Sequence, residues 1–511
     1  MGTRPVSADA EAAGWRLLAP HDGRAQGLVV SGFGKLPCGR ALFLELHQPG
    51  GGWLDALQAV APITSAAGNQ PHAAALGITW SGLQRMGLDA AALAGFDRPF
   101  KEGMFQPDRL RRLGDRRGSE WLETTMPEGP TWSGNAPAAD DATVATPVTV
   151  HAMLLLYTGD DAAAEAWCAQ VSAALAPNGA EVVHRLELDL KTDERGIARE
   201  HFGYADGISQ PLPYAEGVVA ARNGTPITQA TDPWNAVPLG EVLIGYRNGH
   251  NEVPTGPAVP AGEAAQAAGL PPHQKAEGHC DLGQDGSYLV VRELRQHVAS
   301  FWQSHARAAE AIRAGDPSAT NVTPEWIADR AVGRDRDGHL LCPGGLLAPT
   351  ASGQPDNAFG FWDRDRNGTG CPVGAHVRRG NPRDGLAPTE KDKPALLAAA
   401  NNHRLLRRGR SYGPPVVDPL VDDGANRGLL FICLNTDIGR QFEFVQQTWV
   451  LNPNFATLYD EVDPLIGPRG TMTIRESPLR RIVKLETFVQ FAGGEYFFLP
   501  SLPALAYLAS L

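Results

Sequence analysis

The sequence predicts an α+β fold, because strand-like and helix-like segments follow one another in a regular order. Apolar runs and strict alternation mark strands, whereas apolar residues three and four positions apart mark helices. By these criteria the first half has strands at 41–49, at the start of 72–88, at 149–160 and at 180–190, and helices at 53–62 and 161–176. The order strand, helix, strand, strand, helix, strand fits a ferredoxin-like unit.

The helices of the first half each carry an apolar stripe. The stripes consist of Trp53, Leu54, Leu57 and Val60 in the first helix and of Trp167, Val171 and Leu175 in the second. Residues 149–160 are mainly apolar, as in a buried strand. Residues 27–36 are a further strand candidate ahead of the unit.

The second half also alternates between strand-like and helix-like segments, but its residues do not repeat those of the first half. Residues 286–306 are predicted to be a strand that runs into a helix, and 427–435 a strongly apolar strand. Residues 437–450 have helical spacing, and 493–511 end the chain with a strand and a short helix. The pattern is compatible with one topology in both halves.

Length and charge limit the possible functions. The chain has 511 residues, of which 43% are hydrophobic and 20% charged, and this length favours two domains over one small core. The net charge of −12 argues against nucleic acid or an anionic membrane as a partner. No apolar run is long enough to span a membrane, and the first 20 residues lack the apolar centre of a signal peptide. We expect a cytoplasmic protein.

The cysteine and histidine patterns exclude several kinds of metal site. The six cysteines are scattered and form no C-x-x-C pair, so neither a structural zinc or iron–sulfur site nor a disulfide framework is predicted. The absence of C-x-x-C-H argues against covalently attached haem. The absence of H-E-x-x-H argues against a zinc protease site.

One carboxylate lies between two glycines in "EHFGYADGISQP", residues 200–211. Asp206 follows Gly203 and precedes Gly207, and glycines permit tight turns and close approach of the backbone to a ligand. A turn aspartate also commonly caps its own backbone. Asp206 is therefore either a turn cap or an acid presented to a ligand.

A histidine with two arginines behind it stands out in "GTGCPVGAHVRRGNPRD". A neutral imidazole at His376 would be a good iron ligand, and Arg378 or Arg379 would suit the carboxylates of a haem. The alternative is a buried histidine that caps a turn. Farther along, "HRLLRRGRSYG" is either a solvated basic face or a segment in which one arginine, Arg407, points inward beside Leu405 and Leu406.

Several motifs taken together resemble the dye-decolourising (DyP-type) haem peroxidases. They are "GYADG" with "ISQP", "CPVGAHVRRGNPR", "LLRRGRSYG", "RGLLFICLNTDIGRQFEFVQQTW" and "GGEYFFLPS", in this order from about Leu28 to the C-terminus. The length is similar to that of the long bacterial and fungal members. The resemblance implies two ferredoxin-like modules, 1–235 with the G-x-x-D-G motif and 236–511, with the haem held mainly by the second.

The resemblance also implies a role for each singled-out residue. His376 matches the proximal ligand of the haem iron, Asp206 the distal acid and Arg407 the distal arginine. Gly409 stands where short members have an asparagine, so no catalytic role is expected for it. The carboxylate that orients His376 is left open between two candidates, Glu443 and Glu486.

The implied activity is that of a haem b peroxidase with non-covalently bound cofactor. Such an enzyme consumes H2O2 and oxidises bulky aromatic donors, such as dyes and phenolics, through a ferryl intermediate. Tyr412 and Trp449 are either electron relays to these donors or packing residues. Two other functions stay open: haem or porphyrin handling with iron extraction, and a haem carrier or sensor without turnover. A homo-oligomer is possible.

Overall fold

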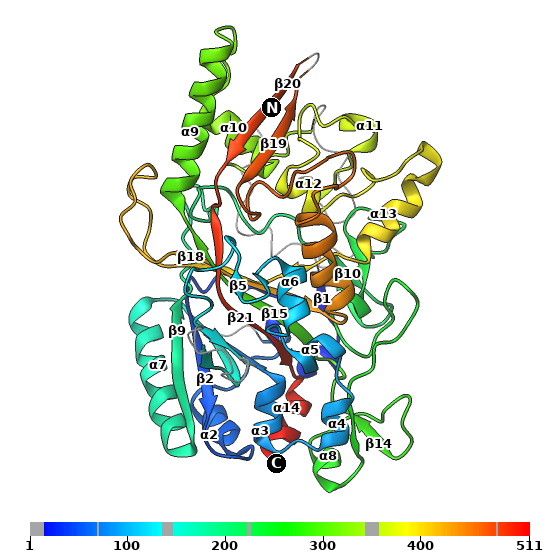
Figure 1. The fold of residues 1–511 in the computed structure, drawn as a ribbon. Coiled ribbons are helices and arrows are strands. Elements are labelled where there is room, and N and C mark those ends of the chain that lie inside the picture. The colour runs from blue at the N-terminus through cyan, green and yellow to red at the C-terminus, as the bar shows by residue number, and fades with distance from the viewer. Residues whose placement is uncertain (1–14, 69–70, 135–146, 222–225, 343–356, 477–478) are drawn as a thin grey trace.

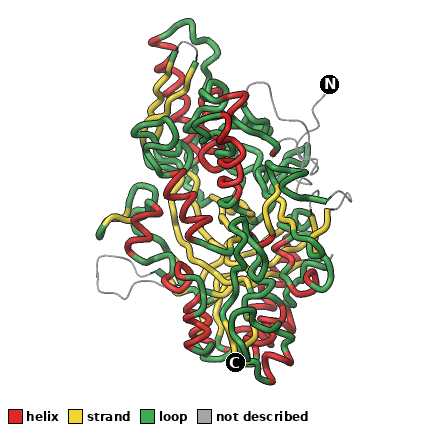
Figure 2. Tube along the Cα trace, turned by 90° about the vertical axis from the view of Figure 1, so that its right-hand side faces the viewer, coloured by secondary structure: helices red, strands yellow, loops and turns green. Residues whose placement is uncertain are grey.

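The protein is described here from a computed structural model that covers residues 15–68, 71–134, 147–221, 226–342, 357–476 and 479–511. Within them one antiparallel sheet is built from β2 (Cys38–Leu46), β3 (Ala73–Ile78), β8 (Ala152–Thr158), β9 (Ala180–Glu187), β15 (Ser287–Gln296), β16 (Leu406–Arg407), β17 (Arg410–Tyr412), β18 (Gly428–Asn435) and β21 (Val489–Leu499). Their order is β16–β18–β15–β21–β3–β8–β2–β9, and β17 also pairs with β18. The sheet runs through the middle of the molecule (Figures 1 and 2).

The sheet consists of two ferredoxin-like modules joined at their edges. The first is β2, α2 (Gly52–Val60), β3, β8, α7 (Asp161–Leu175) and β9, and the second is β15, α9 (Val298–Gly315), β16 with β17, β18, the π-helical turns η7 (Gly439–Glu443) and η8 (Val445–Val450), and β21. In both, the third strand along the chain lies between the second and the first, and the fourth flanks the first. The modules meet where Phe498 pairs with Ile78. This arrangement is the predicted fold class, whereas the boundary at residue 235 stays a prediction.

The helices of the first module form for the reasons that their sequence indicates. The Asp160 carboxylate accepts a hydrogen bond of 2.8 Å from the Ala163 amide and so caps α7. The Trp167 indole donates to the Val60 carbonyl at 2.8 Å, which ties α7 to α2. The predicted stripe residues Leu57 and Val171 are fully buried. Helix α14 (Leu502–Ala509) packs against α2 at the same end of the molecule (Figure 1).

Long connections carry the remaining short elements. The helices are α1 (His21–Arg24), α3 (Trp80–Met86), α4 (Ala90–Ala94), α5 (Arg98–Glu102), α6 (Pro107–Leu113), α8 (Glu263–Ala267), α10 (Pro324–Val332), α11 (Trp362–Asp365), α12 (His376–Gly380) and α13 (Lys393–Asn401). The strands are β1 (Trp15–Leu17), β4 (Arg116–Arg117), β5 (Glu120–Trp121), β6 (Trp132–Ser133), β7 (Val148–Thr149), β10 (Leu212–Tyr214), β11 (Val219–Ala221), β12 (Ala236–Pro238), β13 (Ala258–Pro260), β14 (His279–Asp281), β19 (Gly470–Arg475) and β20 (Arg480–Leu485). No described helix is both long and apolar enough to cross a membrane.

Residues 27–36 are not the predicted strand. They form a 3₁₀ turn, η2 (Gly27–Val29), followed by a loop. Their carbonyls are bound by two arginines instead of a neighbouring strand: Arg408 donates to Leu28 and Val29, both at 2.8 Å, and Arg410 donates to Gly32 at 2.7 Å. Because side chains satisfy these backbone acceptors, the segment does not need a ladder.

A buried ion pair joins the first module's long insertion to the second module's first strand. Arg292 on β15 donates to both carboxylate oxygens of Asp115, at 2.9 and 2.5 Å. Both residues are almost completely buried, and the guanidinium lies 3.9 Å from the centre of the Phe491 ring. Removing one member of such a pair leaves an uncompensated charge in the interior, which costs much more than the pair itself contributes.

We predict that Asp115→Ala lowers the free energy of unfolding by about 3–5 kcal/mol, the usual cost of breaking a buried pair. Urea unfolding followed by tryptophan fluorescence measures this change. Asp108→Ala is the control, because Asp108 pairs with Arg111 and Arg112 at the surface and exposed pairs contribute little. Equal midpoints for the two variants would contradict the prediction.

Candidate active site

Asp206 lies on a loop whose path is determined by a short hairpin. Arg199 and Ala205 form an isolated antiparallel bridge, and the Asp206 amide donates to the Ala198 carbonyl at 3.1 Å. Gly203 and Gly207 both have positive φ, +98° and +80°, as the sequence predicted for this turn. The Asp206 carboxylate accepts from the Gly207 amide at 2.6 Å. Asp206 is thus a turn cap, and it also faces a cavity.

Arg407 reaches the same cavity from the edge of the sheet. Its Nη1 lies 3.8 Å from Oδ1 of Asp206, and about a third of each side chain is exposed. The Gln210 side chain bonds both backbone groups of Arg407: Oε1 accepts from the amide at 2.9 Å and Nε2 donates to the carbonyl at 3.2 Å. The loop of Asp206 and strand β16 are therefore held together by one glutamine.

The basic segment around Arg407 alternates, as a strand does. Arg407 faces the cavity, whereas Arg408 and Arg410 face the other way and bind the carbonyls of residues 28–36. Gly409 approaches β18 so closely that a Cβ would lie 2.4 Å from the Leu430 carbonyl. Arg407 is therefore the arginine of this segment that points into the cavity, whereas Arg404, Arg408 and Arg410 are more deeply buried.

His376 is the first residue of α12, and a buried carboxylate orients its ring. Nδ1 of His376 lies 2.9 Å from Oδ2 of Asp463, whose side chain is fully buried. The other oxygen of Asp463 accepts from the amides of Leu465 and Ile466 at 2.9 and 3.0 Å. Because Asp463 occupies Nδ1, Nε2 is the ring nitrogen that remains for a ligand.

The electrostatics of this pair follow from burial and charge. Burial by itself would lower the pKa of His376, but the Asp463 carboxylate outweighs burial and raises it. Burial would likewise raise the pKa of Asp463, yet the neighbouring His376 and Arg379 lower it. Asp463 is therefore an anion that makes the imidazole a stronger donor toward whatever binds Nε2.

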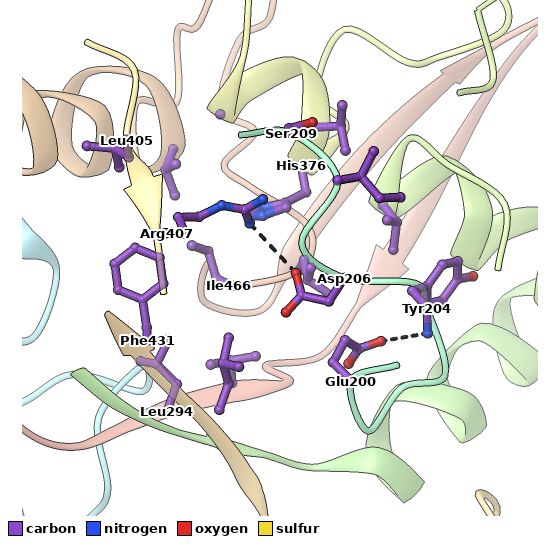
Figure 3. Close-up of a pocket in the computed structure, with 18 of the residues that line it drawn as sticks. Glu200, Tyr204, Asp206, Ser209, Leu294, His376, Leu405, Arg407, Phe431 and Ile466 are labelled. Carbon is purple, nitrogen blue, oxygen red and sulfur yellow. Dashed lines mark hydrogen bonds and ion pairs between the residues drawn. The ribbon is translucent and has the colours of Figure 1, made fainter. Parts of the chain in front are cut away.

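Asp206, Arg407 and His376 all line one cavity. It holds about 1440 Å³ of empty space, part of it open to solvent. Most of its wall is apolar. Strands β15, β18 and β21, the π-helical turns and the loop after Asp463 contribute Leu294, Phe431, Phe442, Val445, Ile466 and Val489 to it. Figure 3 shows Arg407 and Asp206 pointing toward each other, with His376 at the same cavity.

Three other residues expected at the site lie elsewhere. Arg378 is buried away from the cavity and donates to the carbonyls of Asp365 and Cys371 at 2.8 and 3.1 Å, because residues two apart on a helix do not share a face. Neither suggested partner of His376 contacts it. Glu443 binds Arg109 and the Tyr496 hydroxyl, and Glu486 is exposed.

Comparisons with known proteins identify the family. The chain is 31% identical to a multifunctional dye peroxidase of Amycolatopsis sp. over 422 residues, which are 77% of this chain and 80% of that protein. It is 27% identical to peroxidase 2 of Mycetinis scorodonius over 464 residues, 84% of this chain and 75% of the relative. The chain therefore belongs to the dye-decolourising peroxidase family. No protein-family model matches it.

Solved structures of dye-decolourising peroxidases have the same fold. One in complex with 2,6-dimethoxyphenol is 25% identical and superposes with a TM-score of 0.68 over 97% of this chain and all of that one. The DyP-type peroxidase of Anabaena sp. has a TM-score of 0.69 over 96% of this chain and 94% of its own, at 23% identity. The protein is thus an H2O2-dependent oxidoreductase of a family of haem enzymes.

The chemistry of the cavity fits a haem. Its apolar wall suits a flat macrocycle, and Nε2 of His376 suits the iron. Arg334 lines the cavity and donates to the Ser209 hydroxyl at 3.1 Å. Nearby, Nη2 of buried Arg404 has no hydrogen-bond partner among the described residues. Burial and the charge of Arg407 lower the pKa of Arg404 to about 9, so this region favours added carboxylates.

Sequence patterns alone did not indicate several residues of this site. Asp463 lies 87 residues from His376 in a segment without a motif. Arg334 and Gln296, which also line the cavity, lie outside the motifs that carry the family resemblance. Gln210 and Glu200 do lie in "EHFGYADGISQP", where a glutamine and a glutamate beside turn glycines were the available signal.

Proposed function

We propose that the protein is a peroxidase that holds haem b non-covalently in this cavity and oxidises bulky aromatic donors with H2O2. The observation that carries the proposal is the convergence of the Asp463-oriented His376 and the Asp206–Arg407 pair on one cavity. His376 would bind the iron through Nε2, and the second module would supply most of the cavity. Arg334, rather than Arg378, would face the haem carboxylates. The division into modules 1–235 and 236–511 belongs to this proposal.

Asp206 and Arg407 would have different roles in the cleavage of peroxide. When bound, haem supplies the iron that accepts the peroxide and the electrons for its reduction. Asp206 would take the proton from the inner oxygen of H2O2 and return it to the outer oxygen, which leaves as water. Arg407 stays protonated at working pH, so it would stabilise negative charge on the peroxide instead of moving a proton. Gln210 would keep the two at a constant separation.

Bulky donors would need a route for electrons. Tyr412 and Trp449 are only 3% and 6% exposed, so neither could touch a dye directly. Trp449 packs in a cluster with Phe455 and Leu458, and the neighbouring Tyr459 is 85% exposed. Tyr412 packs on the sheet face opposite the cavity wall residues Leu429 and Phe431. Each would act as an internal relay.

We expect the haem site to respond in a graded way to changes at its ligand. His376→Ala should lose the Soret band, because His376 is the one histidine among the described residues that line the cavity. Asp463→Asn should weaken haem affinity about 10- to 100-fold, as loss of a ligand's carboxylate partner does. Haem titration of the apoprotein measures both effects. Asp460→Asn, at an exposed position, is the control. An unchanged spectrum and occupancy in His376→Ala would contradict the assignment.

We expect Asp206→Asn to slow the second-order reaction with H2O2 about 100- to 10,000-fold, and Arg407→Leu about 100- to 1,000-fold. The double variant should be little slower than the worse single variant, because both act on one step. Stopped-flow mixing, followed at the Soret band across pH, measures these rates.

Asp418→Asn is the control for these rates, because Asp418 also caps a turn, accepting from the Leu420 amide at 2.9 Å, but is exposed. Equal rates for Asp206→Asn and the parent would leave Asp206 only its capping role. A parent protein whose bound haem did not react with H2O2 would be a carrier or a porphyrin-handling protein.

We expect Tyr412→Phe or Trp449→Phe to lower turnover of an anthraquinone dye while sparing a small donor that can enter the cavity. The physical reason is that phenylalanine is much harder to oxidise than tyrosine or tryptophan while it keeps most of the packing. Steady-state rates with both donors measure the effect, and Tyr507→Phe on α14 is the control. Equal losses with the two donors would argue against a relay.

A further inference from the structure

Glu200 is a second carboxylate at the cavity, and no proposed step of the peroxide reaction uses it. It precedes Asp206 by six residues and lies on the same hairpin. Its Oε1 accepts from the Tyr204 amide and its Oε2 from the Phe202 amide, both at 2.8 Å. The carboxylate thus satisfies two backbone donors within the turn that leads to Asp206 (Figure 3).

Glu200 also anchors this turn to the sheet. Nε2 of Gln296, the last residue of β15, donates to Oε2 of Glu200 at 2.7 Å. The backbone of Gln296 is itself fixed, because its backbone N–H donates to the Arg427 carbonyl at 2.9 Å. One carboxylate therefore closes the turn and attaches it to the central strand of the second module. The chain that leaves the turn at Ala205 has a defined path to Asp206.

The contact between Glu200 and Gln296 can accommodate either protonation state. Oε1 of Gln296 is buried and has no hydrogen-bond partner among the described residues. If Glu200 takes up a proton, the side-chain amide of Gln296 can flip so that its Oε1 accepts a hydrogen bond from the protonated carboxyl group of Glu200. The atom that lacks a partner beside the carboxylate then gains one.

Charged groups face this turn from several elements. Asp206 lies on the same hairpin. The loop after α10 brings Arg336, whose guanidinium lies against Gly203, and α10 brings Asp329, which accepts from the Tyr204 hydroxyl at 2.8 Å. Arg199 donates to the Gly203 carbonyl at 3.1 Å. Burial, together with the negative charge of Asp206, raises the pKa of Glu200 to about 7, although its three N–H donors oppose the shift.

We propose that Glu200 is a positioning residue for Asp206 and that loss of its proton slows the reaction with peroxide. The proposal rests on the function proposed for Asp206. An ionised Glu200 places a second negative charge beside Asp206, where the peroxide itself acquires negative charge. This charge opposes the stabilisation that Arg407 provides. With its proton in place, Glu200 keeps the turn closed without that repulsion.

Two substitutions separate positioning from ionisation. Glu200→Gln imitates the uncharged acid: it keeps the shape of the side chain and one of the two acceptor oxygens, but it cannot ionise. Glu200→Ala removes all acceptors and leaves the amides of Phe202 and Tyr204 and the Gln296 side chain without their partner. Glu194→Gln, six residues upstream and exposed, is the matched control.

The first measurement does not depend on turnover. Hydrogen–deuterium exchange of the purified protein should show the fastest exchange in residues 200–206 for Glu200→Ala, slower exchange for Glu200→Gln, which keeps one acceptor, and parent-like exchange for the control. Burial raises the pKa of Glu495 to about 7 as well, so the infrared titration compares two proteins: the parent-minus-Glu200→Gln difference should contain a protonated carboxyl band that disappears with a midpoint near pH 7. Unchanged exchange in Glu200→Ala would overturn positioning, and the absence of this band from the difference spectrum would overturn ionisation of Glu200.

The second measurement is the rate constant with H2O2 between pH 5.5 and 8.5. The parent should slow through neutral pH by about tenfold, the factor that corresponds to one pKa unit. Glu200→Gln should lose this alkaline decline, whereas Glu200→Ala should be slower at every pH. Superimposed profiles of Glu200→Gln and the parent would overturn the link to rate. Failure of the proposed function is distinguishable, because the haem-loaded parent would then not react with H2O2 at all.

Discussion

The Asp463 carboxylate is the contact on which the candidate active site depends. It binds Nδ1 of His376 and the amides of Leu465 and Ile466 at once. The first contact aims the imidazole, and the other two close a loop that contributes to the cavity wall. Nearby, buried Arg379 binds the carbonyls of Trp449 and Glu461 at 2.7 and 2.6 Å. The chain on both sides of Asp463 is thereby held in place.

Acidic and cationic side chains reach the cavity from different parts of the chain. The acidic groups Asp206 and Glu200 share one hairpin. For buried Glu200, two turn amides and the Gln296 side chain offset the cost of burial. The cationic groups Arg407 and Arg334 line the cavity and come from separate segments. Three residues before Arg407, buried Arg404 has an N–H group without a partner among the described residues. Such an excess of buried donors suits a cofactor that carries carboxylates and a substrate that acquires negative charge.

Predictions of secondary structure were confirmed where the apolar pattern of one short segment is enough to determine its conformation and burial. The apolar stripes of α2 and α7 are buried as predicted, and the apolar runs of β8 and β18 are central strands. The prediction for residues 27–36 was wrong, since arginines 380 residues away satisfy their carbonyls. Residues 437–450 are helical, but with π-helical hydrogen bonding, which a 3.6-residue period does not reveal.

The sequence by itself determined the order of strands and helices and the family, and it singled out Asp206, His376 and Arg407 as candidate site residues, because motifs and periodicity are local. Tertiary structure decided which partners they have. Asp463 rather than Glu443 or Glu486 contacts His376, Arg378 turns away from the cavity, and Gln210 connects Asp206's loop to Arg407. The contacts of Asp463 and Gln210 join segments 87 and 197 residues apart, and only the folded chain brings such segments together.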